Sequence, residues 1–276
     1  MGPAMPTCTR CTYYYLTEYL PMDLKAGASD LDRYDRMRRI DWIDMDRIFG
    51  ARILVAGAGA LGNEAVKDLL MSGFRRITVV DMDDIVTSNL SRCVFFNETD
   101  VHRGMKCDIL ADRAGRMFPD AAIVPVAGRV QDIDDWNYDC VLGCLDNVSA
   151  RMHVNSHCMF HKVPYVDGAT DGMRGKVQTV LPGGPCLQCA MNRSHVREME
   201  RRFTCTGSGT VYVPHTASDI TTTSVIAAMQ VRECMKVVSG RTDLCIRNIT
   251  YYDGTICDSF TAELDIDGNC PNHQEW

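Results

Sequence analysis

The 276-residue chain carries a formal net charge of −7, with 46% hydrophobic and 24% charged residues, which is typical of a folded soluble protein with a substantial core. The negative charge argues against nucleic-acid binding, and no window is apolar enough to span a membrane. The opening residues lack the basic start and apolar stretch of a secretion signal, so we expect a cytoplasmic protein. Its 14 cysteines are then expected to be reduced thiols, metal ligands or a nucleophile rather than disulfides.

The first 30 residues combine aromatic residues, glycine and proline without a sustained period, and we expect a tail or arm there. Residues 31–276 are expected to form the folded domain. Its first predicted element is a heavily charged helix over residues 32–47, because this stretch is helical in propensity.

Strands and helices alternate through the next hundred residues. Strands are predicted at 52–56, 76–81, 121–128 and 139–147, and helices at about 63–71, at 106–117 and after Asn147. Strands separated by helices predict a Rossmann-like, doubly wound and mainly parallel sheet with helices on both faces. This α/β unit, about residues 31–165, is expected to be the nucleotide-binding half.

The pattern changes after Pro164. Residues 176–184 predict a strand and a turn, and residues 183–219 are rich in Gly, Cys and Arg. An apolar helical stripe follows over residues 218–240, with Ser and Asp at its start and Gly240 at its end, as is typical of capped helices.

A glycine-rich turn, GAGALG, follows the first strand. Gly57, Gly59 and Gly62 allow a tight turn and a close approach of the backbone, and the next helix would direct its free N–H groups at an anion. Asp81, at the end of the next strand, is placed to accept hydrogen bonds from ribose hydroxyls. This pattern alone fits a nicotinamide or flavin dinucleotide as well as ATP.

Motifs beyond Asp81 distinguish these cofactors. DMDDIVTSNLSR, RGMK and CLDN occur in that order, and together they resemble the adenylating enzymes of the ubiquitin-activating superfamily, which includes the ThiF and MoeB sulfur-carrier adenylyltransferases. The resemblance extends from about Arg33 to the C-terminus. It implies that residues 166–276 hold a zinc knuckle, a crossover loop and the C-terminal part of the adenylation domain.

The resemblance also implies roles for single residues. Asn89 and Arg92 would contact the triphosphate of ATP, Lys106 would neutralise its charge, and Asp146 would hold magnesium. The nucleotide-binding set implied in this way is Gly57, Gly59, Gly62, Asp81, Asp83, Asn89, Arg92, Lys106, Asp146 and Asn147.

Arg36, in RYDR, resembles the family's arginine that reaches into the nucleotide site of a partner subunit, which implies a homodimer. Attack of a peptide carboxylate on the α-phosphate of ATP brings two anions together, so Arg, Lys and a metal cation are needed to screen the repulsion. Taken singly, Arg92 and Lys106 would be solvated surface charges. Their order around Asp81 and Asp146 favours the functional interpretation.

Two short motifs far apart in the sequence have metal-ligand spacing. Cys186 and Cys189 in CLQC, with Cys270 and His273 in CPNH, would complete a tetrahedral Cys3His zinc site. The resembled family usually has a second cysteine pair, so His273 departs from its pattern. An N-terminal CTRC, at residues 8–11, has no matching second pair in the tail and is expected to be incidental.

Cys205 is the candidate nucleophile. It lies in the segment where thioester-forming members of the superfamily carry their cysteine. Arg201 and Arg202 would favour the thiolate, and Gly207 and Gly209 would let the loop move. The competing interpretation is a buried structural thiol, because bacterial relatives adenylate without a stable thioester.

The helix after Asn147 carries further candidates. His153, His157 and His161 recur at helical spacing without an acidic companion, which favours an ordinary, partly exposed helix face. Arg151 resembles a family arginine near the nucleotide. The remaining cysteines lack paired spacing or fall in predicted elements, and core packing is expected for Cys93, Cys107, Cys140, Cys144, Cys158, Cys234, Cys245 and Cys257.

The resemblance implies an ATP- and Mg²⁺-dependent enzyme that adenylates the C-terminal carboxylate of a ubiquitin-like protein ending in Gly-Gly. Cys205 would then form a thioester for transfer to a conjugating enzyme. One alternative is a sulfur-carrier or peptide adenylyltransferase without a thioester step. A second is a non-catalytic partner subunit or a nicotinamide-binding sensor.

Overall fold

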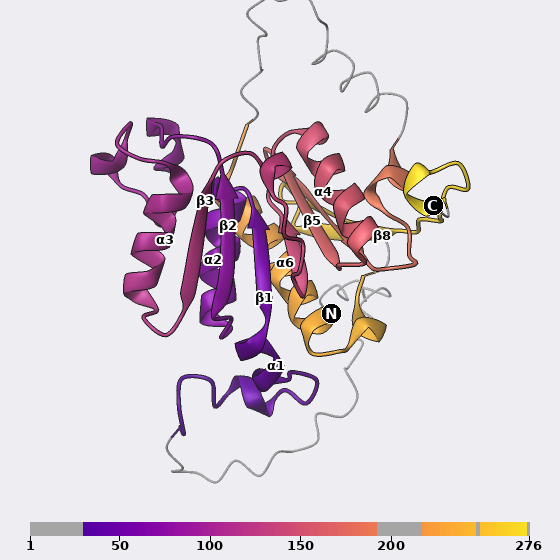
Figure 1. Cartoon of the computed structure of the whole chain (residues 1–276), viewed down its shortest axis with the longest axis horizontal. Helices are drawn as coiled ribbons and strands as arrows, with labels where there is room; N and C mark the ends of the chain where they lie inside the picture. Colours follow the sequence, from indigo (N-terminus) through magenta and orange to yellow (C-terminus); the bar gives the residue numbers. More distant parts are fainter. Residues whose placement is uncertain (1–29, 192–216, 247–248, 275–276) are drawn as a thin grey trace, which may run out of the picture.

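An eight-stranded sheet runs through the computed structural model, which describes residues 30–191, 217–246 and 249–274 (Figure 1). The strands lie in the order β3-β2-β1-β4-β5-β6-β7-β8. Neighbours from β3 to β5 are parallel, and those from β5 to β8 are antiparallel. The strands are β1 (Arg52–Ala56), β2 (Arg76–Asp81), β3 (Ala122–Ala127), β4 (Cys140–Gly143), β5 (Tyr165–Asp171), β6 (Arg174–Val180), β7 (Ile249–Asp253) and β8 (Asp258–Ala262).

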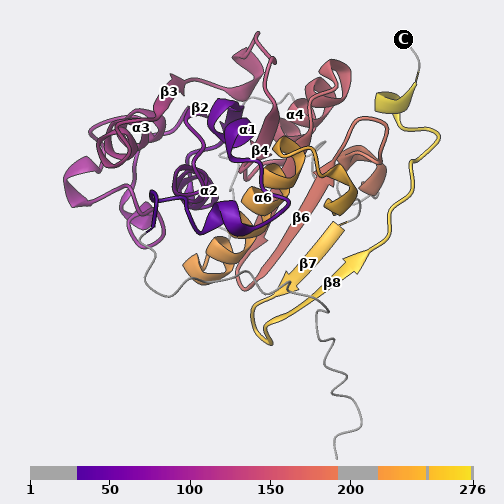
Figure 2. The ribbon, with the colours of Figure 1, turned by 90° about the horizontal axis from the view of Figure 1, so that it is seen from below.

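Helices cover both faces of this sheet. The α-helices are α1 (Met45–Gly50), α2 (Ala60–Met71), α3 (Lys106–Met117), α4 (Val148–His161) and α6 (Ile220–Val238). Short 3-10 helices occupy Met37–Arg39, Thr87–Asn89, Glu98–Asp100, Val130–Asp132, Leu187–Ala190, Thr242–Leu244 and Pro271–His273. Figure 2 shows α2 and α6, which pack against each other, on the side of the sheet opposite α4. None of the helices described here has the length and apolar character that crossing a bilayer demands.

Side chains of β1 alternate between two cores. Ile53 and Val55 belong to the larger core, which β1 shares with α2, α3 and α6, whereas Leu54 and Ala56 belong to the core beneath α4. All four are fully buried, because successive side chains of a strand point to opposite faces and both faces are covered. The predicted Rossmann-like sheet with helices on both faces is therefore confirmed.

The predicted helix over residues 32–47 is wrong for most of its length, since only its last residues enter α1. Aspartate side chains bind the local backbone instead. Asp32 Oδ1 accepts the Tyr34 N–H at 2.8 Å, and the Asp44 side chain caps α1. Aspartate offers such alternatives to helical hydrogen bonds and so favours turns and caps over helix interiors.

Other element boundaries also differ from the prediction. The helix α2 begins at Ala60 rather than near Asn63, because the glycine-rich turn leads into it directly with Gly59 as the N-cap. The strand predicted at 139–147 ends at Gly143. Strands β5, β7 and β8 were not predicted from the sequence.

The sheet brings three carboxyl ends together. Ala56, the last residue of β1, pairs with Val80 of β2 on one side and with Gly143 of β4 on the other. The chain order reverses between β1 and β4, since β2 and β3 lie on one side of β1 and β4 and β5 on the other. Ligands of open α/β sheets bind at such a switch point, outside the carboxyl ends of the strands.

Candidate nucleotide site and Cys/His cluster

The glycine-rich turn lies at this switch point, and two of its glycines are required sterically. Gly57 has φ +103, and a Cβ there would lie 2.5 Å from the Cys144 carbonyl oxygen. A Cβ on Gly62 would lie 1.9 Å from the Gly57 carbonyl oxygen. By contrast, a Cβ on Gly59 would meet no atom within 4 Å. Gly57 and Gly62 therefore hold the turn closed, and Gly59 borders open space at the start of α2.

Asp81 ties the glycine-rich turn to β2. Its Oδ2 accepts the Ala58 N–H at 2.7 Å, and its Oδ1 accepts the Asp83 N–H at 2.8 Å. Burial raises the pKa of the Asp81 carboxyl, and the Ala58 N–H partly opposes this rise. The structure places Asp81 beside the turn, as predicted from the sequence, and its contact with ribose stays a prediction.

Lys106 lies in the first turn of α3 and is nearly buried. Its Nζ is 2.8 Å from Asp83 Oδ2, and its backbone N–H donates to the Asp83 carbonyl at 2.9 Å. The Lys106 cation is thus held beside Asp83, which follows Asp81 by two residues at the end of β2. The structure brings the glycine-rich turn, Asp81, Asp83 and Lys106 together at one edge of the sheet.

Asn89 and Arg92 lie in the segment between β2 and α3. Asn89 is buried, and its Oδ1 accepts the Val86 N–H at 2.9 Å within its own 3-10 helix. Arg92 is partly exposed, and its Nη1 donates to the Ser88 carbonyl at 2.7 Å. Both contacts are local, so they fix the shape of this segment, and the phosphate roles of the two residues stay predictions.

Asn63, which the sequence analysis did not single out, joins this segment to the glycine-rich turn. Its Nδ2 donates to the carbonyls of Ala58, at 2.8 Å, and of Gly59, at 3.2 Å. Its Oδ1 accepts the Phe95 N–H at 3.1 Å, and the side chain is fully buried. A polar residue on the apolar side of α2, four positions after a turn glycine, was the available signal.

The loop after β4 carries Asp146 and Asn147. Asp146 is exposed, two residues after Cys144, whose N–H donates to the Ala56 carbonyl at 2.8 Å. Asn147 is the N-cap of α4, since its Oδ1 accepts the Ala150 N–H at 2.7 Å. Capping accounts for Asn147 structurally, while the magnesium role of Asp146 stays a prediction.

Arg36 lies apart from these residues in the chain, in the segment before α1. Its side chain is 85% exposed, and its Nη2 is 3.6 Å from Asp30 Oδ2. Such a solvated ion pair contributes little to stability.

Arg151, on α4, is held by Asp167 of β5. Its Nε donates to Asp167 Oδ1 at 3.0 Å, and its Nη2 contacts Asp167 Oδ2. The Tyr165 hydroxyl also donates to Asp167 Oδ1, at 2.7 Å. Asp167 has no exposed surface, so this is a buried and nearly neutral group of side chains beside β4.

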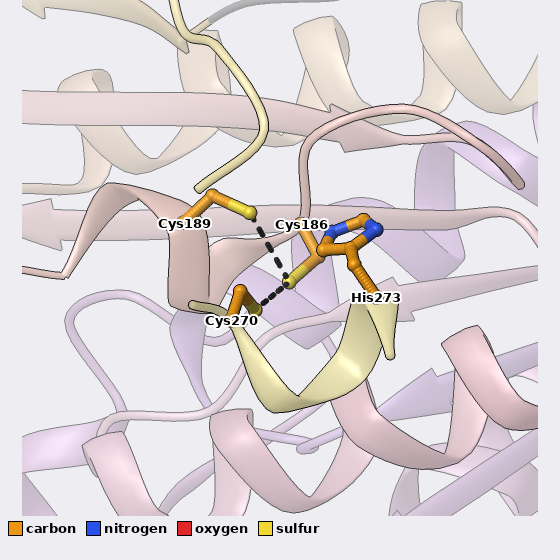
Figure 3. A group of neighbouring side chains, drawn as sticks. All are labelled: Cys186, Cys189, Cys270 and His273. Atoms are coloured by element: carbon orange, nitrogen blue, oxygen red, sulfur yellow. Dashed lines mark hydrogen bonds between the residues drawn. The ribbon is translucent and has the colours of Figure 1, made fainter. Parts of the chain in front are cut away.

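Cys186, Cys189, Cys270 and His273 converge although the two pairs are far apart in sequence (Figure 3). One ligand atom from each lies within 4.8 Å of the others. Cys186 Sγ is 3.9 Å from Cys189 Sγ and 3.7 Å from Cys270 Sγ. The Nε2 atom of His273 is buried and has no hydrogen-bond partner among the residues that the structure describes. The structure therefore brings the four predicted ligands together, and their binding of zinc stays a prediction.

Asn155 of α4 binds the backbone next to Cys186 and so positions this part of the cluster. Its Oδ1 accepts the Leu187 N–H at 2.9 Å. Burial raises the pKa of the Cys186 thiol, but the nearby Asn155 amide, backbone N–H groups and the Asn272 amide, whose Nδ2 lies 3.6 Å from the sulfur, outweigh it, so the pKa is lowered. A lowered pKa favours the thiolate, the form of cysteine that binds metals.

The three histidines of α4 form a stack with Trp136. The His157 ring lies 4.8 Å from the Trp136 ring and 4.2 Å from the His153 ring. His153 and His157 are partly buried and His161 is exposed, as expected for a partly exposed face. Among the other cysteines expected in the core, all that are named above are buried except Cys257, which is exposed in the turn after β7.

Several sequence predictions lie outside the described residues. These are the N-terminal tail with Cys8 and Cys11, and the segment with Arg201, Arg202, Cys205, Gly207 and Gly209.

The chain is similar to known proteins over most of its length. The sequence profile of the ThiF family matches residues 32–272. Molybdopterin-synthase adenylyltransferase of Escherichia coli (strain K12) is 30% identical over 234 residues, which are 82% of this chain and 89% of that protein. The SAMP-activating enzyme E1 of Haloferax volcanii is 28% identical over 264 residues, 91% of each protein.

Another relative matches only in part. The NEDD8-activating enzyme E1 catalytic subunit of Schizosaccharomyces pombe is 34% identical over 153 residues, 52% of this chain. The match spans 34% of that protein, about a third of its length. The solved structure of E. coli MccB with ATP has a TM-score of 0.71 at 19% identity and covers 87% of this chain and 74% of its own, which shows the shared fold.

Proposed function

Because the chain belongs to the ThiF family, we propose that it uses ATP to adenylate the C-terminal carboxylate of a small polypeptide. A carboxylate oxygen attacks the α-phosphorus of ATP, and the bond from that phosphorus to the oxygen bridging to the β-phosphate breaks. Pyrophosphate leaves and the acyl adenylate remains. The substrate we propose is a ubiquitin-like or sulfur-carrier protein that ends in Gly-Gly.

One observation carries this proposal. The N–H of Ala58 in the glycine-rich turn binds Asp81, and the Lys106 cation binds Asp83, so an anion-binding turn and a buried cation meet at the end of β2. A dinucleotide site needs the turn, but its hydride transfer needs no such cation. Charge developing on departing pyrophosphate is stabilised by fixed cations and N–H groups.

The residues at this edge of the sheet would have separate roles in binding ATP. Gly57, Gly59 and Gly62 would admit the phosphates to the backbone, and Asp81 would accept the ribose hydroxyls. The triphosphate would be surrounded by Asn89, Arg92, Lys106, Asp83 and Asn147. The exposed Asp146 carboxylate offers the oxygen ligand that Mg²⁺ prefers, and this ion would screen the phosphate charges. Arg36, exposed in the protomer, would complete the nucleotide site of a second subunit in a homodimer.

We assign zinc to Cys186, Cys189, Cys270 and His273. Zinc–sulfur bonds of about 2.3 Å in a tetrahedron separate two sulfurs by about 3.8 Å. The sulfur separations of 3.9 and 3.7 Å support this assignment, as does His273 Nε2, which lacks a hydrogen-bond partner within the described part of the chain. Zinc would join the segment after β6 to the C-terminal segment, and it takes no part in the chemistry at the switch point.

The proposed second step is a thioester on Cys205, followed by transfer to a conjugating enzyme. The competing candidate is adenylation without a thioester, as in sulfur-carrier pathways. The near-full-length relatives favour neither, since one is named a molybdopterin-synthase adenylyltransferase and the other a SAMP-activating enzyme E1.

Exchange of labelled pyrophosphate into ATP tests the proposed function. The full chain is incubated with ATP, magnesium and small Gly-Gly-ended proteins from the same genome. We expect exchange that depends on one carrier and its terminal carboxylate, and none when NAD replaces ATP. No exchange with any carrier, together with tight NAD binding, would overturn the proposal. A thiol-sensitive carrier adduct that Cys205→Ala removes without loss of exchange would select the thioester pathway.

A further inference from the structure

Cys186 lies at the centre of the Cys/His cluster. Its sulfur is 3.9 Å from Cys189 Sγ and 3.7 Å from Cys270 Sγ, and Figure 3 shows both contacts meeting at this one atom. The residue has no exposed surface. A sulfur buried to this degree is shielded from water, so the hydrogen bonds that it accepts have to come from the protein.

The Asn272 side chain joins the two halves of the cluster. Asn272 lies between Cys270 and His273 in the CPNH motif, and its Nδ2 donates to Cys186 Sγ at 3.6 Å and to Gln188 Oε1 at 3.0 Å. A side-chain amide nitrogen carries two hydrogens, so both bonds can form together. Asn272 therefore contacts a metal-ligand candidate and the middle of the CLQC motif at the same time.

A second amide, that of Asn155, reaches the cluster from α4. The residue has no exposed surface, and its Oδ1 accepts the Leu187 N–H at 2.9 Å. Because an N–H can only donate, the oxygen has to face Leu187, which fixes the orientation of the amide. Its Nδ2 is buried and has no hydrogen-bond partner in the described ranges of the chain. Cys186 precedes Leu187 and lies near this amide, so a thiolate there would give Nδ2 the acceptor that it lacks.

Metal binding increases the need for such donors. Cysteine binds metals as the thiolate, and three thiolates carry more negative charge than one Zn²⁺ ion neutralises. A buried charge is costly unless it is hydrogen-bonded, and N–H groups bind an ionised acceptor more strongly than a neutral one. Amide N–H groups directed at Cys186 therefore stabilise the metal-bound cluster more than the metal-free one.

We propose that Asn155 and Asn272 are positioning residues of the zinc cluster, because both donate N–H···S hydrogen bonds to the Cys186 thiolate and hold its sulfur in place for the ion. Neither amide contacts the ion itself. This inference rests on the proposed zinc site and adds the two side chains that retain zinc there. Asn155 also fixes the cluster to α4, the helix that Asn147 caps at the switch point.

Cobalt substitution of the full chain tests this assignment, because the thiolate-to-cobalt charge-transfer band of a tetrahedral Co²⁺ site depends on the sulfur. A hydrogen bond lowers the energy of the sulfur lone pairs, so its loss should move the band to longer wavelength. We expect this shift in Asn272→Ala and in Asn155→Asp, which keeps an oxygen for the Leu187 N–H. Zinc affinity, measured by competition with a chelator, should fall about 10- to 100-fold in both variants.

Gln188→Met is the matched control. It removes the hydrogen bond between the two motifs and keeps the amide groups of Asn155 and Asn272. Its charge-transfer band should stay at the wild-type wavelength. If Asn272 only clamped the motifs together, Asn272→Ala and Gln188→Met would weaken zinc binding equally and neither band would move, which would overturn the assignment. Asn272 is partly exposed, so Asn272→Ala keeps the test decisive if Asn155→Asp does not fold.

The wild-type chain separates this inference from the proposed zinc site. If the wild type binds Co²⁺ and Zn²⁺ and Asn272→Ala has the same band and zinc affinity, the role of the amide is wrong and the zinc site stands. If the wild type binds neither ion, the zinc site and the role of the amides both fail. Neither measurement needs a carrier or ATP, so both are independent of the proposed adenylation.

Discussion

Lys106 Nζ lies 2.8 Å from Asp83 Oδ2, which joins the first turn of α3 to the loop after β2. The lysine side chain is only 11% exposed, so the ion pair holds a cation in a fixed place at the switch point. A bound triphosphate would find this charge already oriented, without the cost of ordering a flexible lysine.

Replacement of Lys106 by Met should therefore lower the pyrophosphate exchange rate about 100- to 1,000-fold, as loss of one preorganised electrostatic group does. Arg116→Met is the control, because Arg116 is an exposed residue at the far end of the same helix. Exchange assays at saturating ATP measure the effect. Equal rates in the two variants would show that Lys106 has no role in the reaction.

Two glycine substitutions should differ in their effects on the unfolding temperature and on ATP binding. Gly62→Ala places a methyl 1.9 Å from the Gly57 carbonyl, so the turn must shift and the unfolding temperature should fall. Gly59→Ala meets no atom within 4 Å, so its unfolding temperature should stay nearly constant while the added methyl obstructs the phosphates. Calorimetric titration with ATP measures the second effect, and unimpaired ATP binding by Gly59→Ala would place the nucleotide elsewhere.

Asn63→Ala should lower the free energy of unfolding by about 2–3 kcal/mol, because the buried Ala58 carbonyl and the buried Phe95 N–H both lose their partner. Urea denaturation measures this change. Asn97→Ala is the control, since Asn97 is an exposed cap of a 3-10 helix and its loss should cost about 1 kcal/mol. A loss no larger than that of the control would mean that Asn63 does not stabilise the turn.

Removal of the proposed zinc should loosen the C-terminal region. Structural zinc contributes about 10 kcal/mol, so strong chelation or Cys270→Ala should lower the unfolding temperature by more than about 10 °C. Cys257→Ala, at an exposed cysteine, should leave it unchanged. Elemental analysis of the full-length protein should give near-stoichiometric zinc. Absence of zinc together with an unchanged Cys270→Ala variant would contradict the assignment.

The histidine stack predicts a loss of stability in mild acid. Burial lowers the pKa of His153 and of His157, and a neighbouring histidine lowers each further. The unfolded chain, with histidine pKa values near about 6.5, then binds more protons than the folded chain. The free energy of unfolding should fall as pH drops below about 6.5, down to the lowered folded-state values, and stay level above it.

His157→Gln should flatten this pH dependence, with His102→Gln as a control outside the stack. Urea denaturation at pH values between 5 and 8 measures it. An identical slope in wild type and His157→Gln would exclude the stack as its cause.

The sequence predicted β1 and β2 to the residue and located β4, because these strands are mostly buried and each precedes a helix. It also located β3, which is apolar though largely exposed, but it missed β5, which pairs in parallel with β4. The α3 boundaries, 106–117, were predicted to the residue. The antiparallel strands β7 and β8 were missed because β8 is largely exposed and lacks an apolar run. The helix over residues 32–47 was predicted from propensity alone, which does not show that Asp32 and Asp44 bind backbone N–H groups through their side chains.

In the Cys/His cluster, the spacing of residues within each short motif predicted the metal ligands. Two motifs 84 residues apart predicted a four-residue cluster, since each motif holds half of a tetrahedron. For Asn63 the sequence carried a signal, a polar residue on the apolar side of α2, but it could not reveal the contact with Phe95, which lies 32 residues further along the chain. The pairing of Arg151 with Asp167 likewise depends on how α4 packs on β5, which residue spacing does not show.

Oxygen transfer tests the central claim most directly. A Gly-Gly carrier whose terminal carboxylate is labelled with heavy oxygen is incubated with the full chain, ATP and magnesium, and hydroxylamine then cleaves the acyl product. Attack on the α-phosphorus predicts that the label appears in AMP. Label in inorganic phosphate beside unlabelled ADP, or no carrier-dependent cleavage of ATP, would contradict the account.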